Sequence, residues 1–85
     1  MTPDQLKAII EEKLEVQDIA VSGEGNMFDV RVVAEAFDGK TAVKKQQMVY
    51  ATVNEYISSG EIHALSIKAY SPEEWQKASK LQIMG

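Results

Sequence analysis

Two strand-like segments follow each other directly in the first half of the chain, and this succession constrains the fold more than any other feature. Apolar and polar residues alternate over residues 17–22 and again over residues 27–35, which is the period of a strand with one buried face. The residues between them, Gly23-Glu24-Gly25-Asn26, supply glycines for the positive φ angles of a tight reversal. The sequence therefore predicts a β-hairpin. The buried face predicted for its second strand consists of Phe28, Val30, Val32 and Ala34.

A helical segment precedes this hairpin, and a longer one follows it. Thr2-Pro3-Asp4-Gln5 has the form of a capping box with proline at the first helical position, and apolar residues then recur at helical spacing. A second helical period spans about residues 41–59 and ends at Gly60, a residue suited to the left-handed end of a helix. The apolar face predicted for this second helix consists of Val43, Tyr50, Val53 and Ile57, flanked by Ala42, Val49 and Tyr56.

The last third of the chain predicts one more strand and one more helix. Residues 62–70 have strand character, and the helix that precedes them makes this strand parallel to the second one. Ser71-Pro72-Glu73-Glu74 is another capping box, and it begins a short helix that carries Trp75 and Ala78. We therefore expect an α+β fold of order αββαβα, with helices packed on a three-stranded mixed sheet. All 85 residues form one domain, with an ordered core over about residues 2–80 and a short C-terminal tail.

Composition narrows the functions that this domain can have. The chain has no cysteine, which excludes a disulfide framework, a thiol nucleophile and a thiolate cage for a metal. Its 13 acidic residues against 9 lysines and arginines give a net charge of -4, which argues against strong non-specific attraction to nucleic acid or to an anionic membrane. No long apolar run follows a basic start, so we expect no signal peptide, no transmembrane helix and a cytoplasmic location.

His63, the only histidine, is the side chain most able to carry chemistry. A catalytic triad needs a nucleophile, a base and a residue that orients the base, and no GxSxG, HExxH or P-loop motif occurs. We therefore predict that the protein is not an enzyme. From the residues alone, two interpretations of His63 stay open. It is either a structural histidine that satisfies a backbone carbonyl at the end of the sheet, or one ligand of a metal whose other ligands come from a partner.

A run without acidic residues surrounds the start of the predicted long helix. Lys40, Lys44 and Lys45 lie in this run, between Asp38 and Glu55. Lysines near a helix N-terminus could hold a phosphate or a carboxylate of a partner. The alternative interpretation is a solvated face, since no aromatic residue that could stack on a base is interleaved with these lysines.

Two long phrases of the sequence resemble a known family. FDGKTAVKKQQMVY (residues 37–50) and IHALSIKAYSPEEW (residues 62–75) are similar to the signature of the BolA family, in particular its YrbA or IbaG-like branch. The resemblance extends over nearly the whole chain, from the first helix through Trp75. It implies a KH-like fold of the second class, which agrees with the αββαβα order. The chain has no GxxG sequence, the loop with which KH domains hold a nucleic-acid backbone.

The resemblance also implies a partner and a cofactor. BolA-like proteins pair with monothiol glutaredoxins, and the heterodimer shares a [2Fe-2S] cluster in iron–sulfur cluster trafficking and iron regulation. In the family, the histidine at the position of His63 is a cluster ligand, while the glutaredoxin supplies a cysteine and bound glutathione. We therefore expect His63 to be a ligand of a shared cluster and the isolated protein to hold none. We expect the strand end, the helix start and the C-terminal segment to form a docking face for the glutaredoxin, and we expect Lys68 and Tyr70 to belong to that face.

The sequence departs from the family pattern in the loop between the first two strands. The family usually has a second ligand there, histidine or cysteine, but residues 22–27 contain neither. Met27 stands in that place, and its thioether is a poor replacement for imidazole or thiolate at iron. Whether Asn26, Glu24 or solvent fills the gap stays open at this point.

The resemblance implies an alternative function as well, that of a DNA-binding transcriptional regulator of stress responses and cell shape. The DNA contacts expected for that function are at Gly39, Lys40, Lys44 and Lys45. A weak homodimer of the free protein is a further interpretation that the sequence leaves open.

Overall fold

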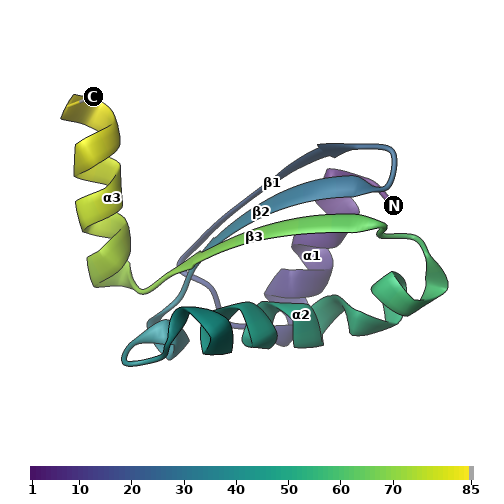
Figure 1. Cartoon of the computed structure of the whole chain (residues 1–85), viewed down its shortest axis with the longest axis horizontal. Coiled ribbons are helices and arrows are strands. Elements are labelled where there is room, and N and C mark those ends of the chain that lie inside the picture. Colours follow the sequence, from purple (N-terminus) through teal and green to yellow (C-terminus); the bar gives the residue numbers. More distant parts are fainter. Residues whose placement is uncertain (85) are drawn as a thin grey trace.

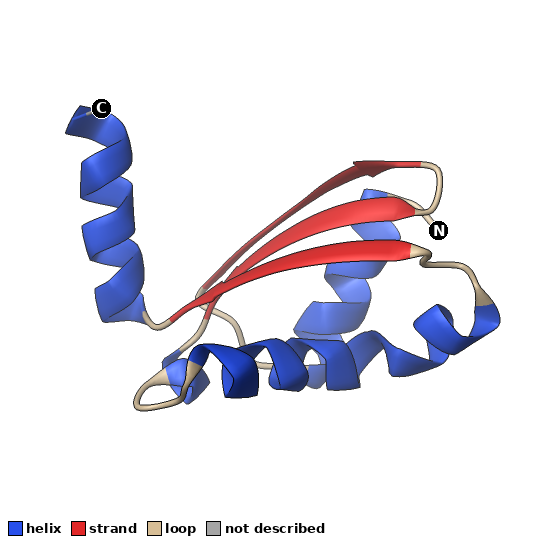
Figure 2. Ribbon diagram, in the orientation of Figure 1, coloured by secondary structure: helices blue, strands red, loops and turns tan. Residues whose placement is uncertain are grey.

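The computed structural model contains a three-stranded sheet with two helices on one face and a third helix at one end (Figures 1 and 2). It describes the backbone of residues 1–84 and the side-chain surroundings of residues 1–80. The elements are α1 (Pro3–Lys13), β1 (Asp18–Glu24), β2 (Met27–Val33), the short 3-10 helix η1 (Glu35–Phe37), α2 (Ala42–Ser59), β3 (Ala64–Tyr70) and α3 (Pro72–Met84). The predicted order of helices and strands is confirmed.

The sheet has the mixed topology that the sequence predicts. Its strand order is β1-β2-β3, with β1 antiparallel and β3 parallel to β2. The hairpin closes where Glu24 pairs with Met27, and Gly25 takes a φ of +62° in the two-residue turn between them, a conformation that glycine adopts without steric cost.

The third strand begins later than predicted, at Ala64 rather than at residue 62. The reason is that the Ile62 N–H donates to the carbonyl of Tyr56, 3.1 Å away, so that the backbone here is bonded to the end of α2 and not to β2. The Ile62 side chain is buried in the core. His63 therefore precedes β3 instead of lying inside it.

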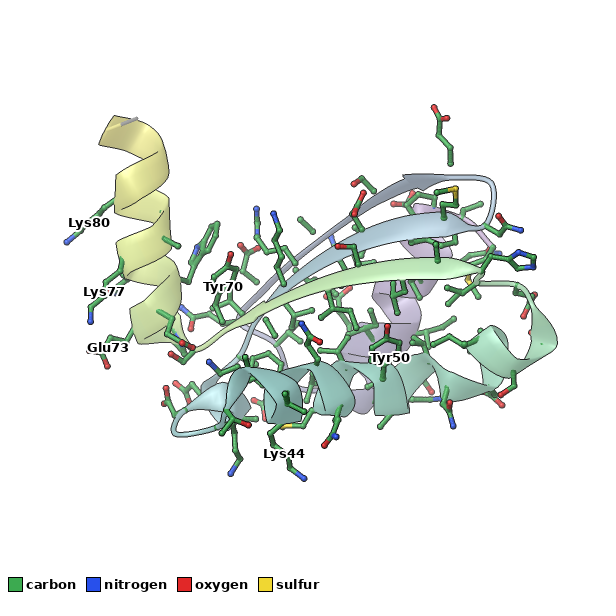
Figure 3. All side chains as sticks on the ribbon, viewed as in Figure 1. Lys44, Tyr50, Tyr70, Glu73, Lys77 and Lys80 are labelled. Carbon is green, nitrogen blue, oxygen red and sulfur yellow. The ribbon has the colours of Figure 1, made fainter. Side chains whose placement is uncertain are left out.

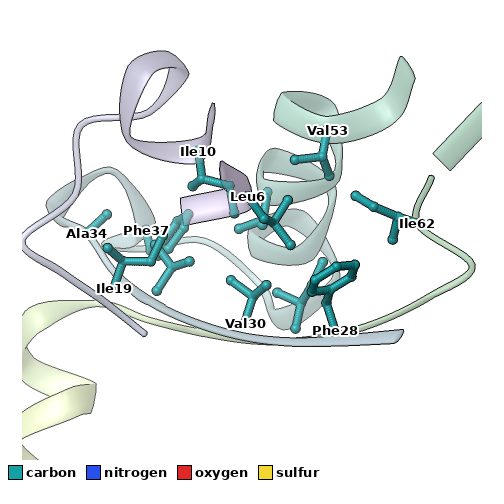
Figure 4. Close-up of a cluster of buried hydrophobic side chains, with 12 residues drawn as sticks. Leu6, Ile10, Ile19, Phe28, Val30, Ala34, Phe37, Val53 and Ile62 are labelled. Atoms are coloured by element: carbon teal, nitrogen blue, oxygen red, sulfur yellow. The ribbon is translucent and has the colours of Figure 1, made fainter. Parts of the chain in front are cut away.

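The core lies between the sheet and the two helices α1 and α2 (Figure 4). The predicted buried face of the second strand is confirmed, because Phe28, Val30 and Val32 of β2 and the following Ala34 are buried. Val33 is fully buried as well, so the alternation of buried and exposed residues ends before the strand does. The buried cluster comprises Leu6, Ile10, Ile19, Phe28, Val30, Val32, Ala34, Phe37, Val49, Val53, Ile62 and Ile67.

The buried face of α2 differs from the prediction. Val49 and Val53 are fully buried, but Val43 is 66% exposed and Tyr50 is 40% exposed. Lys45 and Thr52 are buried instead, since each has a polar partner. The Thr52 hydroxyl donates to the Val49 carbonyl at 2.6 Å, and Lys45 forms an ion pair that is described below. A polar group that has a partner can be buried where an apolar pattern would not place it.

The third helix, α3, stands apart from the other two (Figure 1). It extends away from the end of β3, on the side of the sheet opposite α1 and α2. The prediction that helices cover the core face of the sheet is therefore confirmed for α1 and α2, but not for α3. It reaches Met84 and is longer than the short helix expected, while the predicted tail lies beyond the residues whose side chains are described. None of the described helices is long and apolar enough to cross a membrane.

Candidate functional site

His63 lies at the end of the sheet where the hairpin loop and the end of α2 meet. Its backbone N–H donates to the Asn26 carbonyl at 2.8 Å, and the N–H of Ala64 approaches the same oxygen at 3.3 Å. The turn of the hairpin is thus tied to the start of β3 through the backbone alone. The side chain of His63 is exposed, so its position is fixed by the main chain while the imidazole stays accessible.

The imidazole of His63 lies beside Gly60, the residue that caps the end of α2. Gly60 ends this helix in the left-handed conformation, with a φ of +88°, as the sequence predicts for a helix stop. A Cβ atom added to Gly60 would be 3.6 Å from His63 Nε2. The absence of a side chain on Gly60 therefore leaves room beside the ring.

Met27, the residue in the place of the expected second ligand, lies on the exposed face of β2. It is 61% exposed and belongs with Asp29 to the exposed alternate residues of β2, whereas Phe28 between them is buried. His63 Nε2 lies 3.6 Å from the position that a Cβ atom on Gly60 would take. Asn26 contributes its carbonyl to the backbone of His63.

Lys68 and Tyr70, predicted to contact a partner, lie toward the opposite end of β3. An extended strand rises about 3.3 Å per residue, so Tyr70 is roughly 23 Å along the chain from His63. Lys68 is exposed and Tyr70 half-buried, and both line a shallow groove with Trp75 of α3. Figure 3 shows Tyr70 beside the start of α3.

The start of α2 is at that same end, because Ala42 lines a small groove together with Ala69 and Tyr70. The structure therefore brings together Lys68, Tyr70 and the start of α2, which are expected to share one docking face, but places them away from His63. His63 is at one end of the sheet, and Lys68, Tyr70 and the start of α2 are at the other.

The lysines predicted to contact nucleic acid do not form one patch. Lys40 and Lys44 are exposed, and Gly39 forms the turn before α2 with a φ of +73°. Lys44 points away from the sheet (Figure 3). Lys45 is buried, which corrects the prediction, since its ammonium group is enclosed between α2 and α3 and cannot reach a phosphate group.

Lys45 forms an ion pair with Glu74 at the start of α3. The distance from Lys45 Nζ to Glu74 Oε1 is 2.5 Å. The same carboxylate oxygen accepts a hydrogen bond from the N–H of Ser71 at 2.9 Å, and the Glu74 N–H donates to the Ser71 hydroxyl at 3.3 Å. This is the predicted capping box. The Lys45 ammonium, followed by the Ser71 N–H, lowers the pKa of Glu74 from 4.5 to about 2.

A second cluster of side chains joins α3 to the exposed face of the sheet. Arg31 on β2 donates to Asp18 at 2.9 Å, and its guanidinium carbon is 4.4 Å from the centre of the Trp75 ring. The rings of Trp75 and Tyr70 are 5.4 Å apart. Sequence reasoning missed this cluster, because its members come from four elements, β1, β2, β3 and α3, and only the register of the strands brings them together.

The described residues contain no group of three or more histidine, cysteine, aspartate or glutamate side chains that could hold a metal ion. The chain has one histidine and no cysteine. Its contribution to a metal centre at His63 would therefore be a single imidazole ligand, and the remaining ligands would have to come from another molecule.

Comparisons with known proteins agree on the family. The family model for BolA-like proteins matches residues 2–74. The chain is 46% identical over 81 residues to the acid stress protein IbaG of Escherichia coli, covering 95% of this chain and 96% of that protein. Among solved structures, a BolA homologue from Coxiella burnetii has a TM-score of 0.76 at 33% identity, covering 89% of this chain and 97% of that one. Yeast Fra2 has a TM-score of 0.74 at 36% identity, covering 96% and 91%.

Proposed function

Because the chain belongs to the BolA-like family, we propose that it is a non-enzymatic adaptor that pairs with a monothiol glutaredoxin and supplies His63 as one ligand of a shared [2Fe-2S] cluster. One observation carries this proposal. The only imidazole of the chain is exposed, and its backbone is held by a 2.8 Å hydrogen bond to the hairpin turn. A ligand presented in this way needs little reorganisation when a partner arrives.

The donor set of this chain fits a shared centre. A neutral imidazole is a good ligand for iron, whereas the thioether of Met27 is a poor replacement for imidazole or thiolate. The thiolates that a cluster requires are absent from this sequence, so the glutaredoxin and its glutathione would supply them. Imidazole ligation in place of thiolate raises the reduction potential of such a cluster.

The test is anaerobic cluster reconstitution of a monothiol glutaredoxin and glutathione, with and without this protein. Visible absorption and circular dichroism report the ligands of the cluster, and size-exclusion chromatography reports the complex. We expect a changed spectrum and a one-to-one complex with the wild-type chain. With His63→Ala, we expect the spectrum of the glutaredoxin alone.

A matched control separates loss of the ligand from loss of the docking surface. Glu61→Gln changes another exposed residue two positions away and should leave the spectrum of the mixed complex unchanged. A His63→Ala variant that gave the wild-type spectrum would exclude His63 as a ligand. Absence of both a complex and a changed spectrum with the wild-type chain would exclude the adaptor function.

Met27→His provides the complementary experiment. The variant places an imidazole where the family usually has its second ligand, at an exposed position of β2. If both imidazoles bind the cluster, the variant cluster should decay more slowly than the wild-type cluster under oxygen. Equal decay rates would show that an imidazole at position 27 does not bind the cluster.

A further inference from the structure

β3 is an edge strand: within the described residues, no strand lies on the side that faces away from β2. The Tyr70 carbonyl accepts from the N–H of Ala34 at 3.1 Å, on the side of β2. Backbone groups alternate in direction along a strand. Leu65, Ile67 and Ala69 therefore direct their N–H and C=O groups outward. The Tyr50 hydroxyl, which lies 3.5 Å from the Leu65 carbonyl oxygen, reaches β3 from this outer side.

The outward backbone groups of Ile67 and Ala69 lack a protein partner within the described part of the chain. Backbone donors and acceptors at a sheet edge are a template for another strand. The N–H and C=O groups alternate along this edge, and a polypeptide backbone matches that alternation. A nucleic-acid backbone, which has no amide donors, does not.

A groove runs between this edge and the first half of α2. Ala42 and Gln46 of α2 line it, opposite residues 67–70 of β3. Val43 and Tyr50 lie on the same flank of the helix, because residues three, four and seven positions apart share a face. Both are exposed apolar side chains, and Figure 3 shows Tyr50 directed from α2 toward β3. Exposed apolar side chains of α2 therefore lie beside the edge of β3.

The charge around the groove is opposite to the charge of the whole chain. The net charge is -4, but the groove is lined by Lys68 and by no carboxylate, and the first acidic residue of α2 is Glu55. The one charged side chain that lines this groove is therefore a cation, which favours an acidic segment over a basic one. A second copy of this chain, paired antiparallel about Ile67, would bring two Lys68 side chains to diagonal positions on one face, which is unfavourable.

We propose that the outer edge of β3 binds an extended segment of a partner protein in which apolar and acidic residues alternate. The segment adds to the sheet as a fourth strand beside Ile67 and Ala69. Side chains of a strand point alternately to its two faces, so the apolar ones pack toward Val43 and Tyr50 of α2. The acidic ones lie on the opposite face, where Lys68 is exposed. This is strand addition to a sheet edge, and it is distinct from the cluster site at His63.

The test uses an acetylated six-residue peptide of alternating valine and glutamate, added to the 15N-labelled full chain. We expect shifts in the amide resonances of residues 65–70 and of the first half of α2. The same peptide with N-methylated amides should not bind, because it cannot donate to the strand edge. A valine–lysine peptide should bind roughly five- to tenfold more weakly, as should the valine–glutamate peptide to Lys68→Glu.

Lys7→Glu provides the matched control, since it makes the same charge change at an exposed position of α1 and should leave the affinity unchanged. Val43→Ser, at an exposed position, tests the apolar contact without affecting the core. No binding at millimolar peptide, equal binding of the N-methylated peptide, or shifts confined to other surfaces would overturn the proposal. Concentration-dependent dimerisation with the same shifts and no peptide would also overturn it, because the occupant would then be a second copy.

Discussion

The two ends of β3 are held in place by different kinds of interaction. Before Ala64, the backbone of His63 is bonded to the hairpin turn, and the imidazole is exposed. After Tyr70, side chains are bonded to one another, as in the pair between Lys45 and Glu74. A side chain whose position comes from the backbone remains available to a ligand. A side chain that is already paired contributes to stability, and binding through it would first have to break that pair.

Gly23, at the His63 end of the sheet, is the position where we expect the largest loss of stability. Gly23 in β1 has a φ of +152°, and a Cβ there would lie 2.2 Å from the Met27 carbonyl oxygen and 2.9 Å from Phe28 Cα. Both atoms belong to the backbone, so no rotamer change relieves the clash. We expect Gly23→Ala to lower the free energy of unfolding by roughly 3 kcal/mol, measured by urea denaturation, and to displace the turn that holds His63.

Gly25→Ala is the matched control for that prediction. Gly25 also has a positive φ, +62°, but no heavy atom lies within 4 Å of its added Cβ. The variant has only the intrinsic cost of a left-handed conformation, about 1 kcal/mol. Equal losses in the two variants would show that conformation alone, and not the close approach of β2, requires glycine at Gly23.

The ion pair at the α3 end predicts the next largest effect. The Lys45 side chain is 8% exposed, and that of Glu74 is 48% exposed, so the two halves of the pair are not equivalent. Glu74→Gln leaves a buried ammonium without a counter-charge, and we expect a loss of about 2 kcal/mol, less than for a fully buried pair. Lys45→Met fills the same space with an apolar chain and leaves a carboxylate that water can reach, so we expect about 1 kcal/mol or less.

Urea denaturation of both variants at neutral pH checks this order. A larger loss for Lys45→Met than for Glu74→Gln would mean that solvation of Glu74, and not burial of Lys45, dominates the pair. Neither substitution should alter the spectrum of a cluster bound through His63, because the pair lies at the other end of the sheet.

Most of the fold could be predicted because it depends on local patterns. The capping boxes at Thr2 and Ser71 and the left-handed end at Gly60 all form as predicted, since each needs only residues within one turn of the chain. The buried face of α2 could not be predicted from apolar spacing. Lys45 is buried because Glu74, 29 positions later, neutralises its charge, and no local pattern contains that information.

The candidate site could be predicted in its chemistry but not in its geometry. His63 was identified as the only imidazole in the sequence, and it is exposed in the structure. Its distance from Lys68 and Tyr70 follows from the length of β3, and the exposure of Met27 follows from strand alternation in β2. The unpaired edge of β3 depends on strand order, which becomes visible only in three dimensions.

The pH dependence of stability tests the ion pair between Lys45 and Glu74 in a second way. The folded state lowers the pKa of Glu74 from 4.5 to about 2, chiefly through Lys45, so the unfolded chain binds a proton at this carboxyl more readily than the folded chain does. The stabilisation is complete above about pH 4.5 and is lost as the pH falls toward 2. We therefore expect the difference in unfolding free energy between wild type and Glu74→Gln to shrink by about 1 kcal/mol between pH 6 and pH 3, after allowance for the exposure of Glu74.

Urea midpoints of the two proteins at several pH values measure this difference. Other carboxylates titrate in the same range, but they are common to both proteins and cancel in the comparison. A difference that stayed constant down to pH 3 would show that the ion pair does not contribute through its charge.

The contact of Arg31 with Trp75 predicts the smallest effect. The guanidinium carbon is 4.4 Å from the ring centre, but Arg31 is partly exposed and also pairs with Asp18. We expect Trp75→Leu to lower the free energy of unfolding by about 1 kcal/mol or less, and Asp18→Asn, which leaves the ring in place, to lower it by less than 0.5 kcal/mol or so. Both should leave the cluster spectrum with glutaredoxin unchanged, because both positions lie at the end of the sheet away from the hairpin turn. If Trp75→Leu removed that spectrum while the chain stayed folded, the partner would have to contact both ends of the sheet at once, and the two ends would form one functional surface.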